Sequence, residues 1–303
     1  MKKEIKDVAA SVHQRLLNRA QETRRPFDEL LHYFAMERFL YRLSLSKYKD
    51  KVVLKGALMF IVWETPRSRA TRDIDFLGRM PNAVENLETM VREVCETKAE
   101  PDGIMFDPAS VKGEKIKKDA DYAGVRIRLI GKLGQARANM QIDCGFGDVV
   151  TPDPTEIDYP TILDMPKPRL KGYPRETVVA EKFEAMANRG ILNSRMKDYY
   201  DLWVLAQQFD FNGDLLRDAV LKTFTHRRTE LSTDPVALSS KFFGNTEKQT
   251  QWKAFIHRTQ IENAPQELEE VILFLRGFLI PLAKFANNDK SPGMWAAPGP
   301  WKN

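Results

Sequence analysis

Residues 67–78 read RSRATRDIDFLG, and within them Asp73–Gly78 has the length and apolar content of a short buried strand. Residues two apart on a strand point to the same face, so we expect Asp73 and Asp75 to project together. Carboxylates this close repel each other, and a fold tolerates them mainly when a cation neutralises them or one keeps a proton. Mg²⁺ favours carboxylate oxygens, water and substrate phosphates, so the pair predicts a magnesium site. A solvated edge strand with surface charges is the alternative.

Two further strands are predicted by the alternation of apolar and polar residues. VRIRLIG at 125–131 and NMQIDCGFG at 139–147 both alternate, and KLGQAR at 132–137 is a hairpin loop that would make them antiparallel neighbours. Asp143 falls on the polar side of its strand, where an isolated carboxylate is costly if it is buried without a partner. A two-metal centre for phosphoryl transfer needs a third carboxylate, and Asp143 is the candidate.

The turn that precedes the aspartate pair points to the same chemistry. A short strand at 51–56 turns at Gly56 into an apolar helix at 57–64, and about fifteen residues then lead to the aspartates. This is the layout of a nucleotidyltransferase core, in which backbone N–H groups at a small-residue turn and a helix N-terminus receive the nucleotide phosphates. Lys55 and Gly56 are therefore candidate nucleotide-binding residues.

The chain divides into an α+β half and a helical half. Residues 1–172 would form a nucleotidyltransferase-type core, a mixed or antiparallel sheet flanked by helices, with a lysine-rich connector at 111–124 and a five-proline connector at 151–173. Residues 173–303 would form a helical domain that completes the active-site cleft, and the two tryptophans in its tail predict docking onto the body. The expected helices span residues 5–22, 27–45, 57–64, 81–98, 176–189, 193–209, 214–227, 234–243, 246–259 and 265–287.

The amino-acid composition limits the classes of protein to which the chain can belong. The 303 residues are 43% hydrophobic, enough for a sizeable core, and the net charge of +5 leans toward polyanionic partners, although a well-solvated basic surface explains the charge equally. Two cysteines, no signal peptide and no apolar stretch of roughly 18 residues predict a cytoplasmic protein without a membrane segment. The four histidines lie far apart, which argues against a histidine-based metal site.

Five stretches carry a resemblance to a known family. They are LKGALMF (54–60), RATRDIDF (69–76), QIDCGFGD (141–148), YPRETVVAEKFEAM (173–186) and NSRMKDYYDL (193–202). Their order and spacing resemble the AbiEii/AbiGii toxin family of nucleotidyltransferases, a branch of the DNA polymerase β-like superfamily that includes the MenT toxins. The chain departs from the family at one point, because Gly56 is followed by Ala57 where members usually carry a second glycine or a serine.

The resemblance implies roles for individual residues. The three aspartates would bind two metal ions, Thr71 would lie beside the triphosphate, and Lys182 would meet the β- and γ-phosphates and stabilise the pyrophosphate leaving group. Asp198 and Asp201 are neighbours on the next helix. They either contact the nucleotide, or one of them pairs with Lys182 or Lys197. The expected catalytic set is Asp73, Asp75, Asp143, Lys182 and Asp201, and the expected nucleotide-binding set is Lys55, Gly56, Thr71, Arg72 and Asp198.

The same resemblance implies a Mg²⁺-dependent toxin that moves a nucleoside monophosphate from an NTP to an acceptor and releases pyrophosphate. The expected acceptor is the 3′ end of tRNA, with arrest of translation as the result, and a cognate antitoxin is expected in a toxin–antitoxin or phage-defence system. Arg227, Arg228 and the lysines of 111–124 would supply phosphate contacts, with a solvated face as the alternative for the lysines. Transfer to a protein or small-molecule hydroxyl, or NTP and RNA binding without turnover, remain open.

Overall fold

The computed structural model describes residues 7–65, 71–118, 122–259, 261, 264–286 and 292–302. Contacts divide the chain into two compact units. The first is built from Met1–Glu64, Thr71–Gly147 and Thr155–Gly172. The second is built mainly from Tyr173–Asn303, and it also takes Asp148–Pro154, which the sequence placed with the first half.

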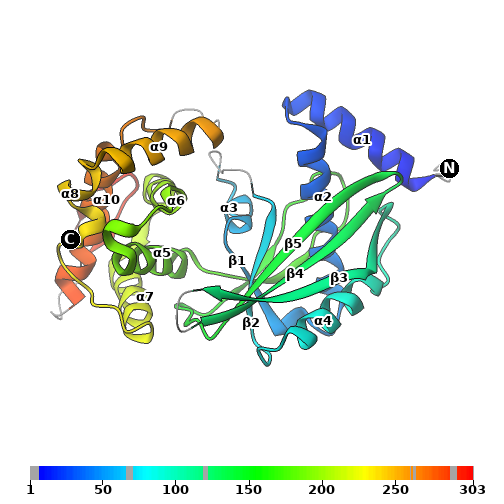
Figure 1. Cartoon of the computed structure of the whole chain (residues 1–303), viewed down its shortest axis with the longest axis horizontal. Helices are drawn as coiled ribbons and strands as arrows, with labels where there is room; N and C mark the ends of the chain where they lie inside the picture. Colours follow the sequence, from blue (N-terminus) through cyan, green and yellow to red (C-terminus); the bar gives the residue numbers. More distant parts are fainter. Residues whose placement is uncertain are drawn as a thin grey trace. The chain divides into compact units, whose positions relative to one another are not determined.

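The first unit is a mixed sheet with helices (Figure 1). Its described strands follow the order β3-β4-β5-β2-β1-β7-β6, and adjacent strands are antiparallel except for the parallel pairs β2–β5 and β1–β7. This arrangement confirms the predicted α+β class. The elements are α1 (Val8–Thr23), α2 (Phe27–Leu45), η1 (Lys49–Lys51), β1 (Val52–Lys55), α3 (Leu58–Val62), β2 (Asp73–Gly78), α4 (Val84–Glu96), β3 (Ile104–Lys118), β4 (Tyr122–Leu133), β5 (Ala136–Phe146), β6 (Thr155–Asp158) and β7 (Arg169–Gly172).

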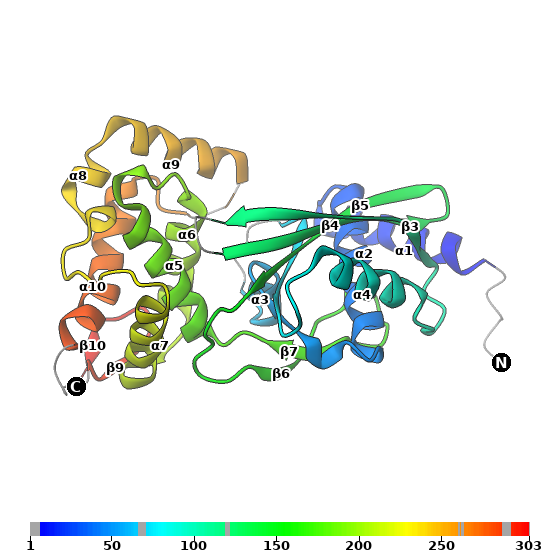
Figure 2. The same cartoon turned by 60° about the horizontal axis from the view of Figure 1, so that its bottom comes forward.

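The two faces of the sheet differ because the strands alternate as the sequence predicts. On β4 and β5, the apolar residues, such as Ile127 and Ile142, are fully buried. Helices α1, α2 and α4 lie against this apolar face (Figure 2). The residues between them in sequence, such as Arg128 and Asn139, are exposed on the opposite, polar face. The hairpin between β4 and β5 is confirmed, with Gly134 at its turn.

Two predicted connectors are wrong. Of the lysine-rich stretch, residues 111–118 belong to β3 and residues 122–124 to the start of β4, while 119–121 lie outside the described residues. Val111 is buried, and backbone pairing with β4 stabilises the strand. β3 is an edge strand, and edge strands carry lysines readily because one side of them faces solvent. The five-proline stretch holds β6 and β7, because its prolines flank the strands and leave the paired residues free to donate hydrogen bonds.

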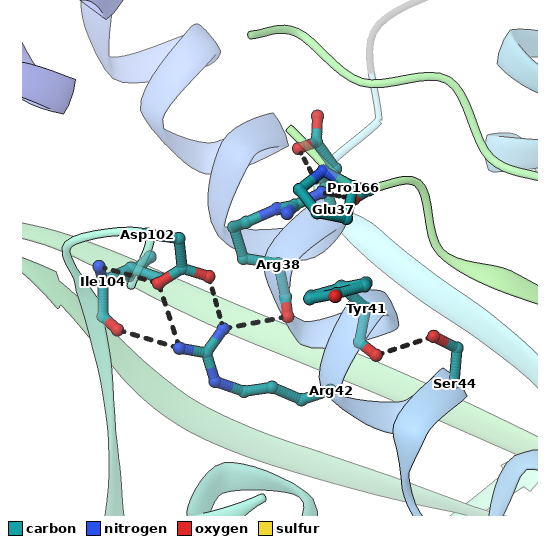
Figure 3. A network of polar contacts seen from close by, with 8 residues as sticks. All are labelled: Glu37, Arg38, Tyr41, Arg42, Ser44, Asp102, Ile104 and Pro166. Carbon is teal, nitrogen blue, oxygen red and sulfur yellow. Dashed lines mark hydrogen bonds and ion pairs between the residues drawn. The ribbon is translucent and has the colours of Figure 1, made fainter. Parts of the chain in front are cut away.

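Helix α2 is buried on nearly all sides, and its buried charged residues are paired (Figure 3). Arg42 donates two hydrogen bonds to Asp102, at 2.7 and 3.0 Å, and a third to the carbonyl of Ile104. Arg38 donates to the carbonyl of Pro166 at 2.8 Å. These bonds tie α2 to the start of β3 and to the loop before β7.

Glu37, beside Arg38 on α2, is a buried carboxylate with an altered pKa. It accepts a hydrogen bond from the N–H of Ile162 at 2.7 Å, and its Oε1 lies 2.8 Å from Arg38 Nη2, an ion pair without hydrogen-bond geometry. Burial raises the pKa of Glu37 to about 7, although Arg38 and the Ile162 N–H act to lower it. Between pH 4.5 and about 7, the Glu37 carboxyl therefore keeps a proton in the folded protein that it has lost in the unfolded chain.

Substituting Glu37→Gln should change how stability depends on pH. The favourable term from Glu37 is complete below the unfolded pKa near 4.5 and is lost as the pH rises through the folded value of about 7. The unfolding free energy of the wild type, measured relative to the variant, should fall by about 2–3 kcal/mol between pH 5 and pH 8. Urea titrations at four pH values measure this difference. A difference that rises with pH would mean that Glu37 is ionised in the folded protein.

The second unit is helical (Figure 1), and it also contains a three-stranded sheet. Trp295 is 3% exposed and donates to the carbonyl of Ala206 at 2.7 Å, while Trp301 donates to the carbonyl of Phe278, so the predicted docking of the tail is confirmed. The region 234–243 holds one 3-10 turn and one short helix, where a single helix was expected. The elements are α5 (Arg175–Arg189), η2 (Gly190–Leu192), α6 (Met196–Gln208), β8 (Phe211–Asn212), α7 (Gly213–His226), η3 (Val236–Leu238), α8 (Ser240–Phe243), α9 (Thr246–Thr259), α10 (Leu268–Ala286), β9 (Met294–Trp295) and β10 (Trp301–Lys302).

Candidate active site

The sheet brings the three predicted metal-binding aspartates onto neighbouring strands. Asp73 and Asp75 lie on β2, and in the parallel pairing of β2 with β5 the Cα partner of Asp75 is Asp143. Paired residues on adjacent strands project to the same face, so all three carboxylates belong to the polar face of the sheet. Asp143 is 7% exposed, and the other two are half-buried.

The turn after β1 lies against Asp75. Lys55 is the Cα partner of Asp75 on β1, and Gly56 follows it with φ +73°. A Cβ placed on Gly56 would fall on the Asp75 carboxylate, so only glycine allows this approach. Helix α3, which follows the turn, has five residues and is shorter than the sequence predicted, so its N-terminus contributes a weak dipole.

Substituting Gly56→Ala should destabilise the protein and displace Asp75. The left-handed backbone costs an alanine about 1–2 kcal/mol, and the collision with the carboxylate adds to this cost. Gly134→Ala is the matched control, because Gly134 has φ +58° with open space around its Cβ position. Urea unfolding should show the larger loss of stability for Gly56→Ala. Equal losses in the two variants would show that the approach to Asp75 is unimportant.

Helix α2 fixes the backbone immediately before the aspartate pair. The hydroxyl of Tyr33 accepts a hydrogen bond from the Thr71 N–H at 2.9 Å, and His32 Nε2 lies 2.7 Å from the carbonyl oxygen of Arg72. The Thr71 hydroxyl lies 3.4 Å from the backbone N and O of Asp73. Sequence reasoning missed His32 and Tyr33, because nothing in their spacing indicates a contact with a strand so far along the chain.

Asp143 already has a cationic partner. Arg126, on β4, donates from Nε to one oxygen of Asp143 and from Nη2 to the other, both at 2.8 Å. These bonds raise the pKa of Arg126, and the nearby charge of Asp73 adds to the effect. The sequence placed Arg126 and Asp143 on polar faces of antiparallel neighbours, but their pairing depends on register, which alternation alone does not give.

The donor chemistry at β2 fits a hard divalent cation. Among the described residues, no group of three or more His, Cys, Asp or Glu side chains is arranged to hold a metal ion, and Arg126 engages both oxygens of Asp143. Asp73 and Asp75 still provide two carboxylates on one face, and Mg²⁺ commonly binds one or two carboxylates together with water and substrate phosphates. The assignment of Asp143 as a metal ligand stays a prediction.

A second cluster lies between α5 and α6 of the helical unit. Lys182 Nζ donates to Asp198 at 2.7 Å and to Asp201 at 2.8 Å. The lysine side chain is 16% exposed, and those of the aspartates are 7% and 4% exposed. Asp198 and Asp201 share a face of α6, as their spacing predicts, and the ion pair that the sequence left open is present.

Arg227 belongs to a separate ion-pair cluster in the same unit. It donates to Asp148 at 2.8 Å and to Glu184 at 2.7 Å. Although burial acts to lower the pKa of Arg227, its acidic neighbours, with Glu181 among them, raise it. The charge of Arg227 is therefore neutralised within the protein, and no RNA phosphate is needed to pair with it. Arg228 is exposed.

The sequence matches one protein family, and the fold is similar to that of two solved structures. A family model described as nucleotidyl transferase AbiEii toxin, type IV TA system, matches residues 38–272. The crystal structure of JHP933 from Helicobacter pylori is similar in fold, with 16% sequence identity and a TM-score of 0.50, over 86% of this chain and 94% of that chain. A proposed nucleotidyltransferase from H. pylori has 16% identity and a TM-score of 0.47, over 86% and 97%. No curated protein matches the sequence.

Among the described helices, none is both long and apolar enough to cross a membrane.

Proposed function

Because the chain belongs to the AbiEii family of nucleotidyltransferase toxins of type IV toxin–antitoxin systems, we propose that it moves a nucleoside monophosphate from an NTP to an acceptor hydroxyl on tRNA. The observation that carries the proposal is the pairing of Asp75 with Asp143 on adjacent strands, with the Gly56 turn against Asp75. Acidic residues at one end of a strand pair, beside a turn of small residues, are the parts that phosphoryl transfer needs.

Residues of the first unit have separate roles in the proposed transfer reaction. Mg²⁺ bound by Asp73 and Asp75 would neutralise charge on the triphosphate and on the reacting oxygen. The backbone at Lys55 and Gly56 receives phosphate oxygens, and Arg72 adds a positive charge before the strand. The oxygen of the acceptor hydroxyl forms a bond to the α-phosphorus and loses its proton to water, the bond from the α-phosphorus to the bridging oxygen breaks, and pyrophosphate leaves.

In the helical unit, we propose Lys182 as the residue that meets the β- and γ-phosphates. Two carboxylates accept hydrogen bonds from its Nζ, which restricts the position of the ammonium group. Asp201 and Asp198 would act by orienting this lysine.

A basic surface supports an RNA acceptor. Lys132 and Arg137 lie on the same polar face as the aspartates, where the register pairs them on β4 and β5, and Lys132 also lies 3.4 Å from Asp107. Arg137 is exposed, and the chain carries a net charge of +5. Phosphate contacts of this kind give affinity without sequence choice, so we propose tRNA, modified at its 3′ end, with a block in translation as the outcome. The family implies an antitoxin that reverses the effect.

Transfer of label tests the proposal directly. Purified protein is incubated with each radiolabelled NTP, Mg²⁺ and total tRNA, with an EDTA sample and an Asp75→Asn sample as controls. A labelled RNA band supports the proposal. Label on protein or on a small molecule would show that the acceptor is a protein or a small molecule. NTP binding without any transfer would indicate a binding module.

A further inference from the structure

The bidentate contact between Arg126 and Asp143 changes the charge of the metal site. Asp73, Asp75 and Asp143 together carry three negative charges, and the guanidinium removes one of them. The Arg126 side chain is 28% exposed and that of Asp143 is 9% exposed, so solvent screens the pair only in part. Paired hydrogen bonds between a guanidinium and a carboxylate fix both groups in one orientation.

This contact also occupies the atoms that a metal would need. Both oxygens of Asp143 accept hydrogen bonds from Arg126 at 2.8 Å. A cation next to Asp75 would therefore face a guanidinium-bound carboxylate on β5 rather than an open ligand. Direct coordination by Asp143 requires Arg126 to leave at least one of these oxygens.

We propose that Arg126 is a positioning residue that holds Asp143 away from the cation when no nucleotide is bound. The first divalent ion then binds at Asp73 and Asp75 alone, and binds weakly. Phosphate oxygens are alternative bidentate partners for a guanidinium, so an arriving triphosphate gives Arg126 another place to bind and releases Asp143. Arg126 thereby couples binding of the metal to binding of the substrate. This inference rests on the metal site of the proposed function.

Arg128 provides a matched control on the same strand. It lies two residues from Arg126 on the same face of β4, and its ion pair is with Glu114 at 2.8 Å. Its Cα partner on β5 is Gln141, so Arg128→Gln removes the same charge from the same face without touching Asp143.

The experiment measures binding of Mn²⁺, as a spectroscopic probe of the Mg²⁺ site, by electron paramagnetic resonance without nucleotide. Arg126→Gln should bind Mn²⁺ about tenfold more tightly than the wild type, because Asp143 becomes a ligand and one nearby positive charge is gone. Arg128→Gln should stay within about threefold of the wild type. The charge-neutral double variant Arg126→Gln/Asp143→Asn should return to the wild-type affinity.

Two results would overturn the proposal. One is an Arg126→Gln variant that binds Mn²⁺ no more tightly than Arg128→Gln. The other is a double variant that binds at least tenfold more weakly than the wild type, which would make Asp143 a ligand already. The double variant leaves no unpaired buried charge. It therefore tests whether Asp143 already binds the metal in the wild type, even if Arg126→Gln fails to fold. Wild-type protein that binds no Mn²⁺, even with a non-hydrolysable NTP, would instead contradict the metal site of the proposed function.

Discussion

Replacing Asp75→Asn should abolish nucleotide transfer and leave the protein folded. Asparagine keeps the shape that fits against the Gly56 turn, but it removes the negative charge that would hold the cation. Loss of a metal ligand at a phosphoryl-transfer site forfeits several kcal/mol of transition-state stabilisation, so the rate should fall on the order of 10³-fold or more. Stability should be unchanged or slightly higher, because one carboxylate of a repelling group is gone.

The control is Glu114→Gln, which removes a negative charge from β3 on the same sheet. Glu114 pairs with Arg128 near the surface, and its side chain is 47% exposed, so transfer should continue at a near-normal rate. Rates come from the radiolabel assay, and urea unfolding reports stability for both variants. Asp73→Asn should behave like Asp75→Asn. Retained transfer in either variant would remove that aspartate from the metal site.

If Lys182 meets the leaving pyrophosphate as proposed, replacing it in Lys182→Ala should slow transfer by about 10²-fold or more, because that positive charge is lost. The same change leaves Asp198 and Asp201 buried without their shared partner, so stability should also fall, by about 3–5 kcal/mol. Lys197→Ala is the control. Lys197 is exposed on α6 beside Asp198, and its removal should have a small effect on both quantities.

Loss of folding and loss of chemistry can be separated for Lys182. In Lys182→Ala/Asp198→Asn/Asp201→Asn the buried charges are gone together, so much of the stability should return. Transfer should remain slow in that variant, because the ammonium is still missing. Near-normal turnover in any folded variant without Lys182 would assign the lysine a structural role. Saturation with NTP distinguishes a change in kcat from a change in KM.

Local patterns predicted the core of the first unit. DIDFLG alternates and ends at a glycine, and it is β2 with the predicted bounds. The alternation of β4 and β5 likewise fixed which residues face the helices, because one face of each strand is buried. From α2 to α7, apolar periodicity located each helix to within a few residues, apart from the short α3.

The sequence did not predict which residues face each other on adjacent strands. Arg126 could have faced any residue of β5, and only the register places it opposite Asp143. β3 was missed because its lysines suggest a solvated loop, whereas backbone pairing along β4 makes it a strand. The pair between Lys182 and its two aspartates was foreseeable, because spacing put both carboxylates on one side of α6 and the lysine on an inward face.

The parallel pairing of β2 with β5 has a consequence for synthesis of the protein on the ribosome. Asp73 and Asp75 leave the exit tunnel well before Asp143, with β3 and β4 between them, and Lys182 follows later still. A nascent chain that stops before β5 lacks the neighbour of β2, so it presents an incomplete acidic face. The pairing of Asp75 with Asp143 therefore forms only after β5 has been synthesised.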